Sequence, residues 1–287
     1  MTKVFESINE FADLCIGLQD KNQSPTIAVA GFKGIGKSTF SIQLYKAFCK
    51  KKGIPFGFDR LTWSRQKLLT WIDGDKKAAA DPITGLRPGQ LPKKSFIIAD
   101  ELFKMFYKRQ WYASGQQDAL AVLNTCRDRN LLMVGCNPNF FALDKDFRDT
   151  IMFYVFIQDQ GLAVVYEQEG NAFTTDQWNA DENKKLIRKY KKDASRLPNY
   201  LCQFHFPDLP DDEKIAYEAL RNQKRIDEMN EQPTDKVSKI TKASKQRDDV
   251  IKIVKRLHPD LSAAAIAELC NLDERLVYRA LENNHDN

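Results

Sequence analysis

The sequence predicts an α/β fold with a central, mostly parallel sheet, followed by a small all-α domain at the C-terminus. Over the first half of the chain, short apolar segments of strand length alternate with segments whose apolar residues repeat at helical spacing, which is typical of a parallel sheet covered on both faces. Residues 232–246 are rich in lysine and poor in aromatic residues, which indicates a linker. We therefore expect a domain of residues 1–231, a basic linker of residues 232–246 and a helical domain of residues 247–287.

The elements of the first domain follow from these patterns in order. Residues 4–18 have apolar side chains at helical spacing, and residues 26–30 form an apolar strand that runs into a glycine turn. Residues 73–94 contain glycine, proline and lysine without periodicity, which predicts a loop. The remaining expected elements are a helix at residues 39–50, a strand at 95–99, a helix at 116–129 and a strand at 131–136.

Beyond residue 150 the pattern changes from parallel to antiparallel. Residues 151–157 and 162–168 are apolar segments joined by a Gln-Asp-Gln-Gly turn, which predicts an antiparallel hairpin on the edge of the sheet. Residues 184–192 form a basic segment of helical pattern, and residues 211–230 predict a polar helix.

Composition excludes several classes of protein. The 44 basic and 39 acidic side chains give a net charge of +5, an excess too small to indicate a nucleic-acid partner by itself. The six cysteines are scattered and form no Cys-x-x-Cys pair, which disfavours a disulfide framework or a zinc knuckle. We find no signal peptide and no apolar run of roughly 18 residues that would span a membrane, so we expect a cytoplasmic protein.

A glycine-rich segment carries the strongest functional pattern. Its sequence, GFKGIGKST, fits Gly-x-x-x-x-Gly-Lys-Ser/Thr, and it follows an apolar strand and opens a helix. The glycines allow positive φ, so that backbone N–H groups close around phosphate oxygens at the positive end of the helix dipole. We therefore expect this segment to bind ATP through Gly31, Phe32, Lys33, Gly34, Ile35, Gly36, Lys37, Ser38 and Thr39.

Three side chains of this loop have separate roles. Lys37 is expected to contact the β- and γ-phosphates, and Ser38 to offer its hydroxyl to Mg²⁺. Lys33 makes the loop resemble the two-lysine variant of ParA-type ATPases, but a solvated lysine explains it equally well.

A second apolar strand ends in the adjacent acids Asp100 and Glu101. Strand ends at this edge of a parallel sheet face the ligand crevice. Asp100 would hold the magnesium ion, and Glu101 would orient and deprotonate an attacking water. The adjacent pair favours hydrolysis over phosphoryl transfer to a metabolite. A solvated strand end is the simpler alternative.

Polar residues near the third strand are candidates for sensing the γ-phosphate. Asn137 ends that strand, although an asparagine before Pro138 is also a common turn former. Arg127 and Arg129 precede the strand, and either would act across a subunit boundary as an arginine finger in a homo-oligomer. Arg148 is a second-rank candidate for the same role. A surface arginine or an ion pair explains each arginine as well.

Together these motifs resemble an additional-strand, catalytic-glutamate P-loop ATPase. Within that group, residues 26–168 are similar to the zonular-occludens-toxin-like and FtsK/HerA-like ATPases of phages, archaeal viruses and plasmids. The resemblance rests on the phosphate loop, the Asp100-Glu101 strand, Asn137 and the stretch 143–148. It implies a P-loop NTPase fold, ATP and Mg²⁺ as cofactors, and the host cytoplasm as location if the chain is virus-encoded. Membrane-anchored members of the toxin-like group carry a spanning helix, which this sequence does not show.

Residues 266–281 resemble a helix-turn-helix. Ser262 would cap its first helix, Asn271 would hold the turn, and the second helix would pack through Leu272, Val277 and Leu281 on Ile266 and Leu269. The expected DNA-contacting residues are Arg275, Tyr278, Arg279, Lys252 and Lys255. Asp273 and Glu274 would repel phosphate, so a protein-docking module remains the alternative.

These features favour an ATP hydrolase coupled to DNA handling in a virus or mobile element, as an oligomeric motor, packaging or loading ATPase. An ATP-dependent switch that binds DNA and recruits another machine, as regulators of transposition, partition or replication do, is the alternative. A small-molecule kinase is a third reading, against which the acidic pair and the basic tail both count.

Overall fold

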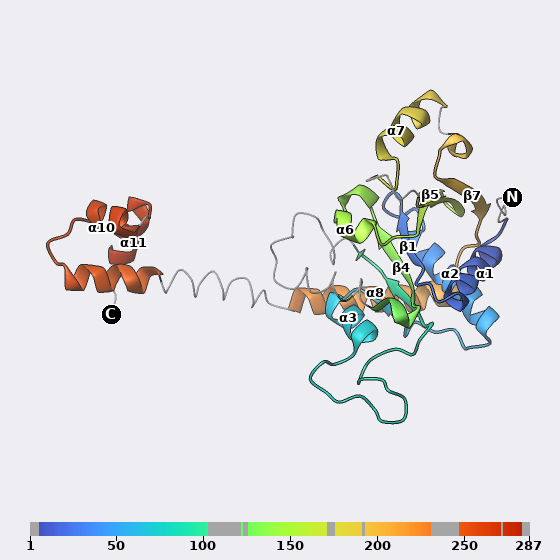
Figure 1. The fold of residues 1–287 in the computed structure, drawn as a ribbon, viewed down its shortest axis with the longest axis horizontal. Coiled ribbons are helices and arrows are strands. Elements are labelled where there is room, and N and C mark those ends of the chain that lie inside the picture. The colour runs from blue at the N-terminus through green and yellow to red at the C-terminus, as the bar shows by residue number, and fades with distance from the viewer. Residues whose placement is uncertain are drawn as a thin grey trace. The chain divides into compact units, whose positions relative to one another are not determined.

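The computed structural model describes residues 6–102, 122, 126–170, 176–190, 193–230, 247–270 and 272–282. The chain divides into two compact units, Met1–Tyr217 and Glu218–Asn287. The first unit is built around a sheet and the second from helices (Figure 1). In these described ranges, no helix combines the length and the apolar character that crossing a membrane requires.

The sheet of the first unit has seven strands in the order β2-β3-β4-β1-β5-β6-β7. Every neighbouring pair from β2 to β5 is parallel, and the pairs β5–β6 and β6–β7 are antiparallel. The strands are β1 (Thr26–Ala30), β2 (Leu61–Thr62), β3 (Phe96–Ala99), β4 (Leu132–Asn137), β5 (Phe153–Asp159), β6 (Leu162–Glu167) and β7 (Tyr200–His205). This confirms the predicted α/β fold with a mostly parallel sheet.

Strand β4 lies between β1 and β3, although it follows both of them in the chain. Its register aligns Asn137 with Ala30 at the end of β1, and Gly135 with Ala99 at the end of β3. The carboxyl ends of these three parallel strands therefore meet at one edge of the sheet.

The predicted hairpin is present as β5 and β6, but it is not the edge of the sheet. Strand β7 pairs with β6 along its length, from Leu162 opposite His205 to Tyr166 opposite Tyr200. The segment of β7 carries apolar residues at Leu201, Cys202 and Phe204, a strand signal that the sequence prediction overlooked.

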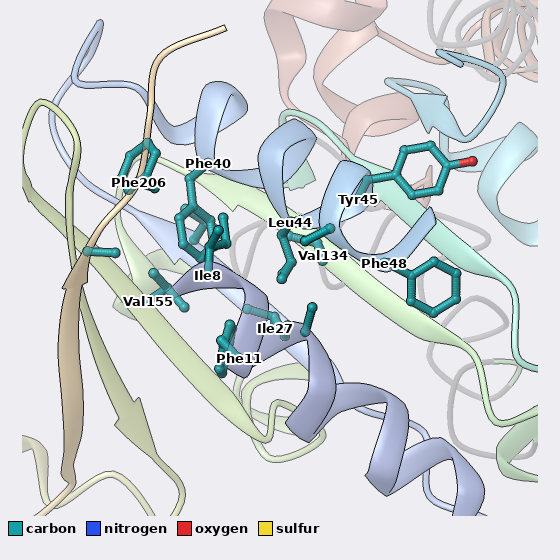
Figure 2. Close-up of a cluster of buried hydrophobic side chains, with 14 of the residues drawn as sticks. Ile8, Phe11, Ile27, Phe40, Leu44, Tyr45, Phe48, Val134, Val155 and Phe206 are labelled. Atoms are coloured by element: carbon teal, nitrogen blue, oxygen red, sulfur yellow. The ribbon is translucent and has the colours of Figure 1, made fainter. Parts of the chain in front are cut away.

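Helices lie on both faces of the sheet. On one face, α1 and α2 pack against β1, β4 and β5, and Figure 2 shows side chains from these elements meeting in one cluster. On the other face, α3 and α6 pack against the same central strands. The helices of the first unit are α1 (Ile8–Asp20), α2 (Lys37–Lys52), α3 (Arg65–Asp73), α6 (Lys145–Arg148), α7 (Ala180–Lys189) and the beginning of α8 (Asp211–Asn230), with short 3₁₀ turns η2 (Cys126–Arg129), η3 (Phe140–Ala142) and η4 (Ala194–Arg196).

Aromatic side chains dominate the larger cluster. Phe11 of α1 is fully buried, with its ring 5.4 Å from Phe153 and 5.9 Å from Phe204. Ser7 caps α1 by accepting from the backbone N–H of Glu10, which fixes where this helix begins. The buried ring holds α1 against β5 and β7.

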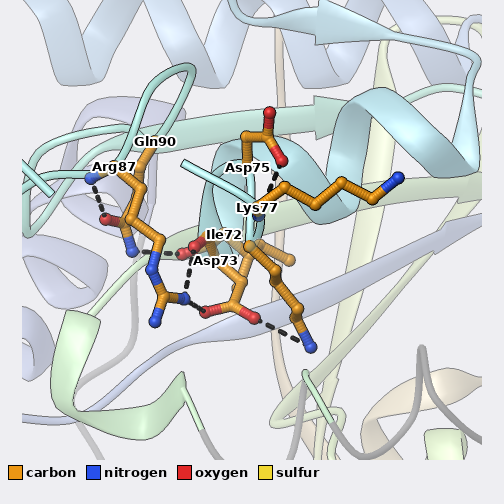
Figure 3. Close-up of polar contacts among 7 residues, drawn as sticks. Ile72, Asp73, Asp75, Lys77, Arg87 and Gln90 are labelled. Atoms are coloured by element: carbon orange, nitrogen blue, oxygen red, sulfur yellow. Dashed lines mark hydrogen bonds and ion pairs between the residues drawn. The ribbon is translucent and has the colours of Figure 1, made fainter. Parts of the chain in front are cut away.

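The long connection after α3 is tied down by polar contacts. Arg87 donates to the backbone carbonyl and the carboxylate of Asp73, at 3.2 and 3.0 Å, and Gln90 donates to the Ile72 carbonyl (Figure 3). Gly74 has φ of 76°, and a Cβ there would lie 2.3 Å from Cβ of Arg87. Residues 74–95 are loop, as expected, but the chain folds this loop back onto the end of α3.

Several boundaries differ from the prediction. The sequence reasoning missed α3 and β2, because nine and two residues are too short to show a clear period. The basic helix begins at Ala180 rather than at residue 184. Most of the helix expected at 116–129 lies outside the described residues, and its last residues form the 3₁₀ turn η2. The polar helix at 211–230 is confirmed as α8.

The second unit has its own small core. Residues 247–257 are helical, and they are followed by α10 (Ala263–Cys270) and α11 (Glu274–Glu282). In the part of this unit that the structure describes, the fully or nearly fully buried residues are Ile251, Ile266, Ala267, Val277 and Ala280.

Truncating the buried ring of Phe11 should destabilise the first unit strongly. Phe11→Ala leaves a cavity beside Phe153 and Phe204 and should lower the free energy of unfolding by about 3–5 kcal/mol. Ile83 is 92% exposed, so Ile83→Ala is the matched control and should change it by no more than about 0.5 kcal/mol. Urea denaturation followed by circular dichroism measures both. Equal effects of the two substitutions would contradict the packing described.

Candidate active site at the carboxyl edge of the sheet

The predicted phosphate loop connects β1 to α2 and has the backbone that the glycine pattern requires. Gly31, Gly34 and Gly36 have φ of 151°, 81° and 103°. A Cβ on Gly31 would lie 2.9 Å from the carbonyl oxygen of Ile157 at the end of β5, so no larger residue fits without a shift. Helix α2 begins at Lys37, and its first N–H groups face the loop that precedes it. The loop is therefore shaped to surround an anion.

Lys37 bends back over this loop. Its Nζ donates to the carbonyl oxygens of Gly31 at 3.0 Å and Phe32 at 2.8 Å. These contacts place a positive charge at the mouth of the loop, where a phosphate group would lie. Phe32 and Lys33 are exposed, whereas Ile35 and Thr39 are half-buried.

Ser38 and Asp100 join the loop to the acidic strand. The Ser38 hydroxyl lies 3.2 Å from each carboxylate oxygen of Asp100, which is a buried residue directly after β3. A hydroxyl and a carboxylate form an oxygen donor set that suits Mg²⁺, which in NTPases completes its shell with phosphate oxygens and water. The two residues predicted to hold the metal are thus brought together by the fold, although 62 positions separate them in the chain.

Two further side chains contact Asp100, and no sequence motif pointed to either. The indole Nε1 of Trp63 donates to its Oδ2 at 3.1 Å, and the hydroxyl of Tyr217 donates to the same oxygen at 2.7 Å. Burial, followed by the neighbouring Asp100 charge, raises the pKa of the Tyr217 phenol well above its usual value. Tyr217 therefore remains a hydrogen-bond donor throughout the physiological pH range.

Glu101 occupies an unusual backbone conformation. Its φ is +61°, in the left-handed region that non-glycine residues rarely adopt, and its N–H donates to Oδ1 of Asp100 at 3.2 Å. Such conformations cluster at functional sites. The turn also places Leu102 over β4, where a Cβ on Gly135 would lie 2.3 Å from a Leu102 methyl group. Gly135 therefore allows the chain to turn after the acidic pair.

Asn137 ends β4 between the loop and the acidic pair, but its amide forms a turn. Its Nδ2 donates to the Asn139 carbonyl at 2.6 Å, and its Oδ1 accepts from the Asn139 N–H at 3.3 Å. These are the contacts that the turn-forming alternative predicted. A γ-phosphate sensor role for Asn137 stays a prediction.

The arginine candidates occupy different environments. Arg129 is buried and donates to the carbonyl of Leu91. An arginine finger must be exposed at the surface to reach a neighbouring subunit, so the prediction of that role for Arg129 is corrected. Arg148 lies over the ring of Phe141, at 5.4 Å. The side chain of Arg127 lies outside the described part of the structure, and its role stays a prediction.

The second unit bears out only part of the helix-turn-helix prediction. Ser262 does cap α10, accepting from the Ala265 N–H at 3.2 Å, and Val277 packs on Ile266. Leu269, expected in the core, is 69% exposed. Asn271 lies outside the described residues.

The residues predicted to contact DNA differ in their exposure and in their contacts. Arg275 and Tyr278 are exposed on α11, but Lys255 donates to the carbonyls of Pro259 and Leu261, both at 2.7 Å, and so closes the turn before α10. Lys252 is half-buried, and the side chain of Arg279 is not described.

Comparisons with known proteins give structural similarity at low sequence identity. No protein-family model matches the chain, and no curated protein matches it. The genome packaging NTPase B204 of Sulfolobus turreted icosahedral virus 2, in complex with ATPγS, matches 50% of this chain and 92% of its own length at 12% identity and a TM-score of 0.34. The N-terminal domain of zonular occludens toxin from Neisseria meningitidis matches 55% of this chain and 91% of its own length at 14% identity and a TM-score of 0.34. A chain of the E. coli MS115-1 HORMA:CdnC:Trip13 complex matches 68% of this chain and 71% of its own length at 12% identity and a TM-score of 0.35.

Removing the Lys37 ammonium should abolish tight nucleotide binding. Lys37→Ala deletes the charge at the mouth of the loop, so affinity for a fluorescent ATP analogue should fall by roughly tenfold or more. Lys50→Ala, an exposed position on the same helix, is the matched control and should bind as the parent does. Unchanged affinity in a folded Lys37→Ala variant would remove the phosphate loop from the site.

Proposed function

We propose that this chain is a magnesium-dependent ATP hydrolase. The observation that carries the proposal is the Ser38–Asp100 contact, which joins a glycine loop of phosphate-binding shape to a buried carboxylate at the end of the acidic strand. If the glycine turn had no function, nothing would require the buried carboxylate of Asp100 to face the hydroxyl of Ser38 at the start of the following helix. The left-handed Glu101 next to that acid adds a second feature typical of catalytic sites.

Each residue of the site has a task in this proposal. The loop N–H groups and Lys37 bind the phosphate chain, and Ser38 with Asp100 holds the magnesium ion, directly or through water. When bound, Mg²⁺ neutralises phosphate charge as it develops during the reaction. Glu101 orients the attacking water and accepts its proton.

Replacing the Glu101 carboxylate should slow hydrolysis without weakening ATP binding, so this substitution tests the hydrolytic role directly. Glu101→Gln keeps the size of the side chain and removes the base, so the variant should bind ATP with parental affinity and hydrolyse it roughly 100-fold more slowly. Release of phosphate in single-turnover reactions measures the rate, and binding of a fluorescent ATP analogue checks the affinity. Parental turnover by Glu101→Gln would move the catalytic role to another residue.

We further propose that hydrolysis is coupled to DNA handling by a homo-oligomer of a virus or mobile element, acting in the host cytoplasm. Two features support a DNA partner: the exposed Arg275 and Tyr278 of α11, and the lysine-rich residues 232–246. Cationic side chains release counterions from the phosphate backbone, and an aromatic ring can stack on bases. In such an oligomer, Arg127 and Arg148 are the remaining candidate arginines for a site shared between subunits.

Removing the C-terminal unit tests the DNA partner. A chain that ends at Gln232 keeps the whole of α8 and all site residues, so its basal ATPase should persist, while its DNA affinity should fall at least tenfold at low salt. In the full chain, the Arg275→Ala/Tyr278→Ala double variant should weaken DNA binding. Glu268→Ala, at an exposed position of α10, should leave it unchanged or slightly stronger. Fluorescence anisotropy with a labelled duplex measures each. Equal DNA affinity in the truncated and full chains would assign the C-terminal helices to protein docking.

A further inference from the structure

The carboxylate of Asp100 receives unequal hydrogen bonding on its two oxygens. Oδ2 accepts the shortest bond of the group, from the Tyr217 hydroxyl at 2.7 Å, and a second bond from Trp63 at 3.1 Å. Oδ1 accepts from the Glu101 N–H at 3.2 Å, and the Ser38 hydroxyl lies 3.2 Å from both oxygens. Among the described residues, Tyr217 and Trp63 thus donate to Oδ2, whereas Ser38 faces both oxygens.

Tyr217 reaches Asp100 from a segment that is held against α2, which we call the α8 strap (residues 206–217). Gln43 of α2 donates to the carbonyls of Pro207 and Asp208, at 3.2 and 2.8 Å. One turn further along α2, Lys46 forms a 2.6 Å ion pair with Glu213. At the start of the strap, the ring of Phe206 packs edge-on against Phe40 of α2, with a centroid distance of 5.3 Å. The strap is thus fixed to the same helix that supplies Ser38.

A carboxylate with one strongly bonded oxygen is restricted in rotation. Because Tyr217 and Trp63 donate to Oδ2 from different segments and the Glu101 N–H donates to Oδ1, the carboxylate of Asp100 is held with both oxygens within reach of the Ser38 hydroxyl. That orientation keeps the carboxylate facing Ser38, the residue with which it would share the metal or its water ligand. A pre-oriented ligand binds more tightly than one that must be ordered on binding.

From this geometry we propose that Tyr217, assisted by Trp63, is a positioning residue for the magnesium carboxylate, and that the α8 strap holds it there. This inference rests on the proposed function, because it assumes that Asp100 serves the metal. It adds to that function a residue that lies outside every sequence motif of the site. Tyr217 touches Asp100 and acts through it.

The experiment measures the Mg²⁺ requirement of nucleotide binding. A fluorescent ATP analogue is titrated against the full chain at a series of free Mg²⁺ concentrations. Tyr217→Phe keeps the ring in its place and removes only the donor, so the Mg²⁺ concentration for half-maximal binding should rise by roughly tenfold. Binding in excess EDTA, which reports the loop without the metal, should not change. Tyr166→Phe, a tyrosine of β6 that lines the opposite face of the sheet, is the matched control and should need no more Mg²⁺ than the parent.

Two additional variants make each outcome decisive. Ser38→Ala tests the metal site itself: if it leaves the Mg²⁺ requirement unchanged, the proposed function fails. If Ser38→Ala raises the requirement and a folded Tyr217→Phe does not, only the positioning role is wrong. Trp63→Phe removes the second donor to Oδ2 and should raise the requirement in the same direction, which tests the inference independently should Tyr217→Phe not fold. If neither Tyr217→Phe nor Trp63→Phe raises the Mg²⁺ requirement, the positioning proposal is overturned.

Discussion

The carboxylate of Asp100 connects four segments that are distant in the chain. It accepts from Ser38 at the start of α2, from Trp63 after β2, from the backbone of Glu101, and from Tyr217 of α8. A buried carboxylate needs such partners, because an unpaired charge in a protein interior is strongly unfavourable. The arrangement of the loop, the acidic strand and the α8 strap therefore depends on this one group, and the network specifies where its oxygens point.

Strand order makes that network possible. Because β4 lies between β1 and β3, one strand separates the phosphate loop from the acidic pair. Ser38 reaches Asp100 across the end of that strand. Close approach of the backbone is required at two places, at Gly31 beside Ile157 and at Gly135 beneath Leu102. Gly31 belongs to the phosphate-loop motif and lets that loop pass close to β5. Gly135 leaves room for the turn that contains Glu101.

The two units have different physical characters. The first unit buries large aromatic residues on both faces of a seven-stranded sheet, which gives the site a rigid frame. Among its described residues, the second unit buries five small to medium side chains and exposes Val250, Ile253, Leu257 and Leu269. A core of that size provides little stabilisation by burial alone. The binding role that we propose for this unit belongs to its exposed charged and aromatic residues.

The amino-acid sequence alone determined the elements whose cause is local. The phosphate loop was predictable because its glycine and lysine spacing reflects backbone geometry within nine residues, and the acidic pair because an apolar strand precedes it. The parallel sheet followed from the alternation of strands and helices, and α8 from its uninterrupted helical pattern. Tertiary structure decided what depends on contacts between distant segments. It placed β7 beyond the hairpin, buried Arg129 under Leu91, turned the Asn137 amide onto Asn139, and brought Trp63 and Tyr217 to Asp100. No local pattern records such contacts, because each depends on how the strands are ordered and on which helix packs over which strand.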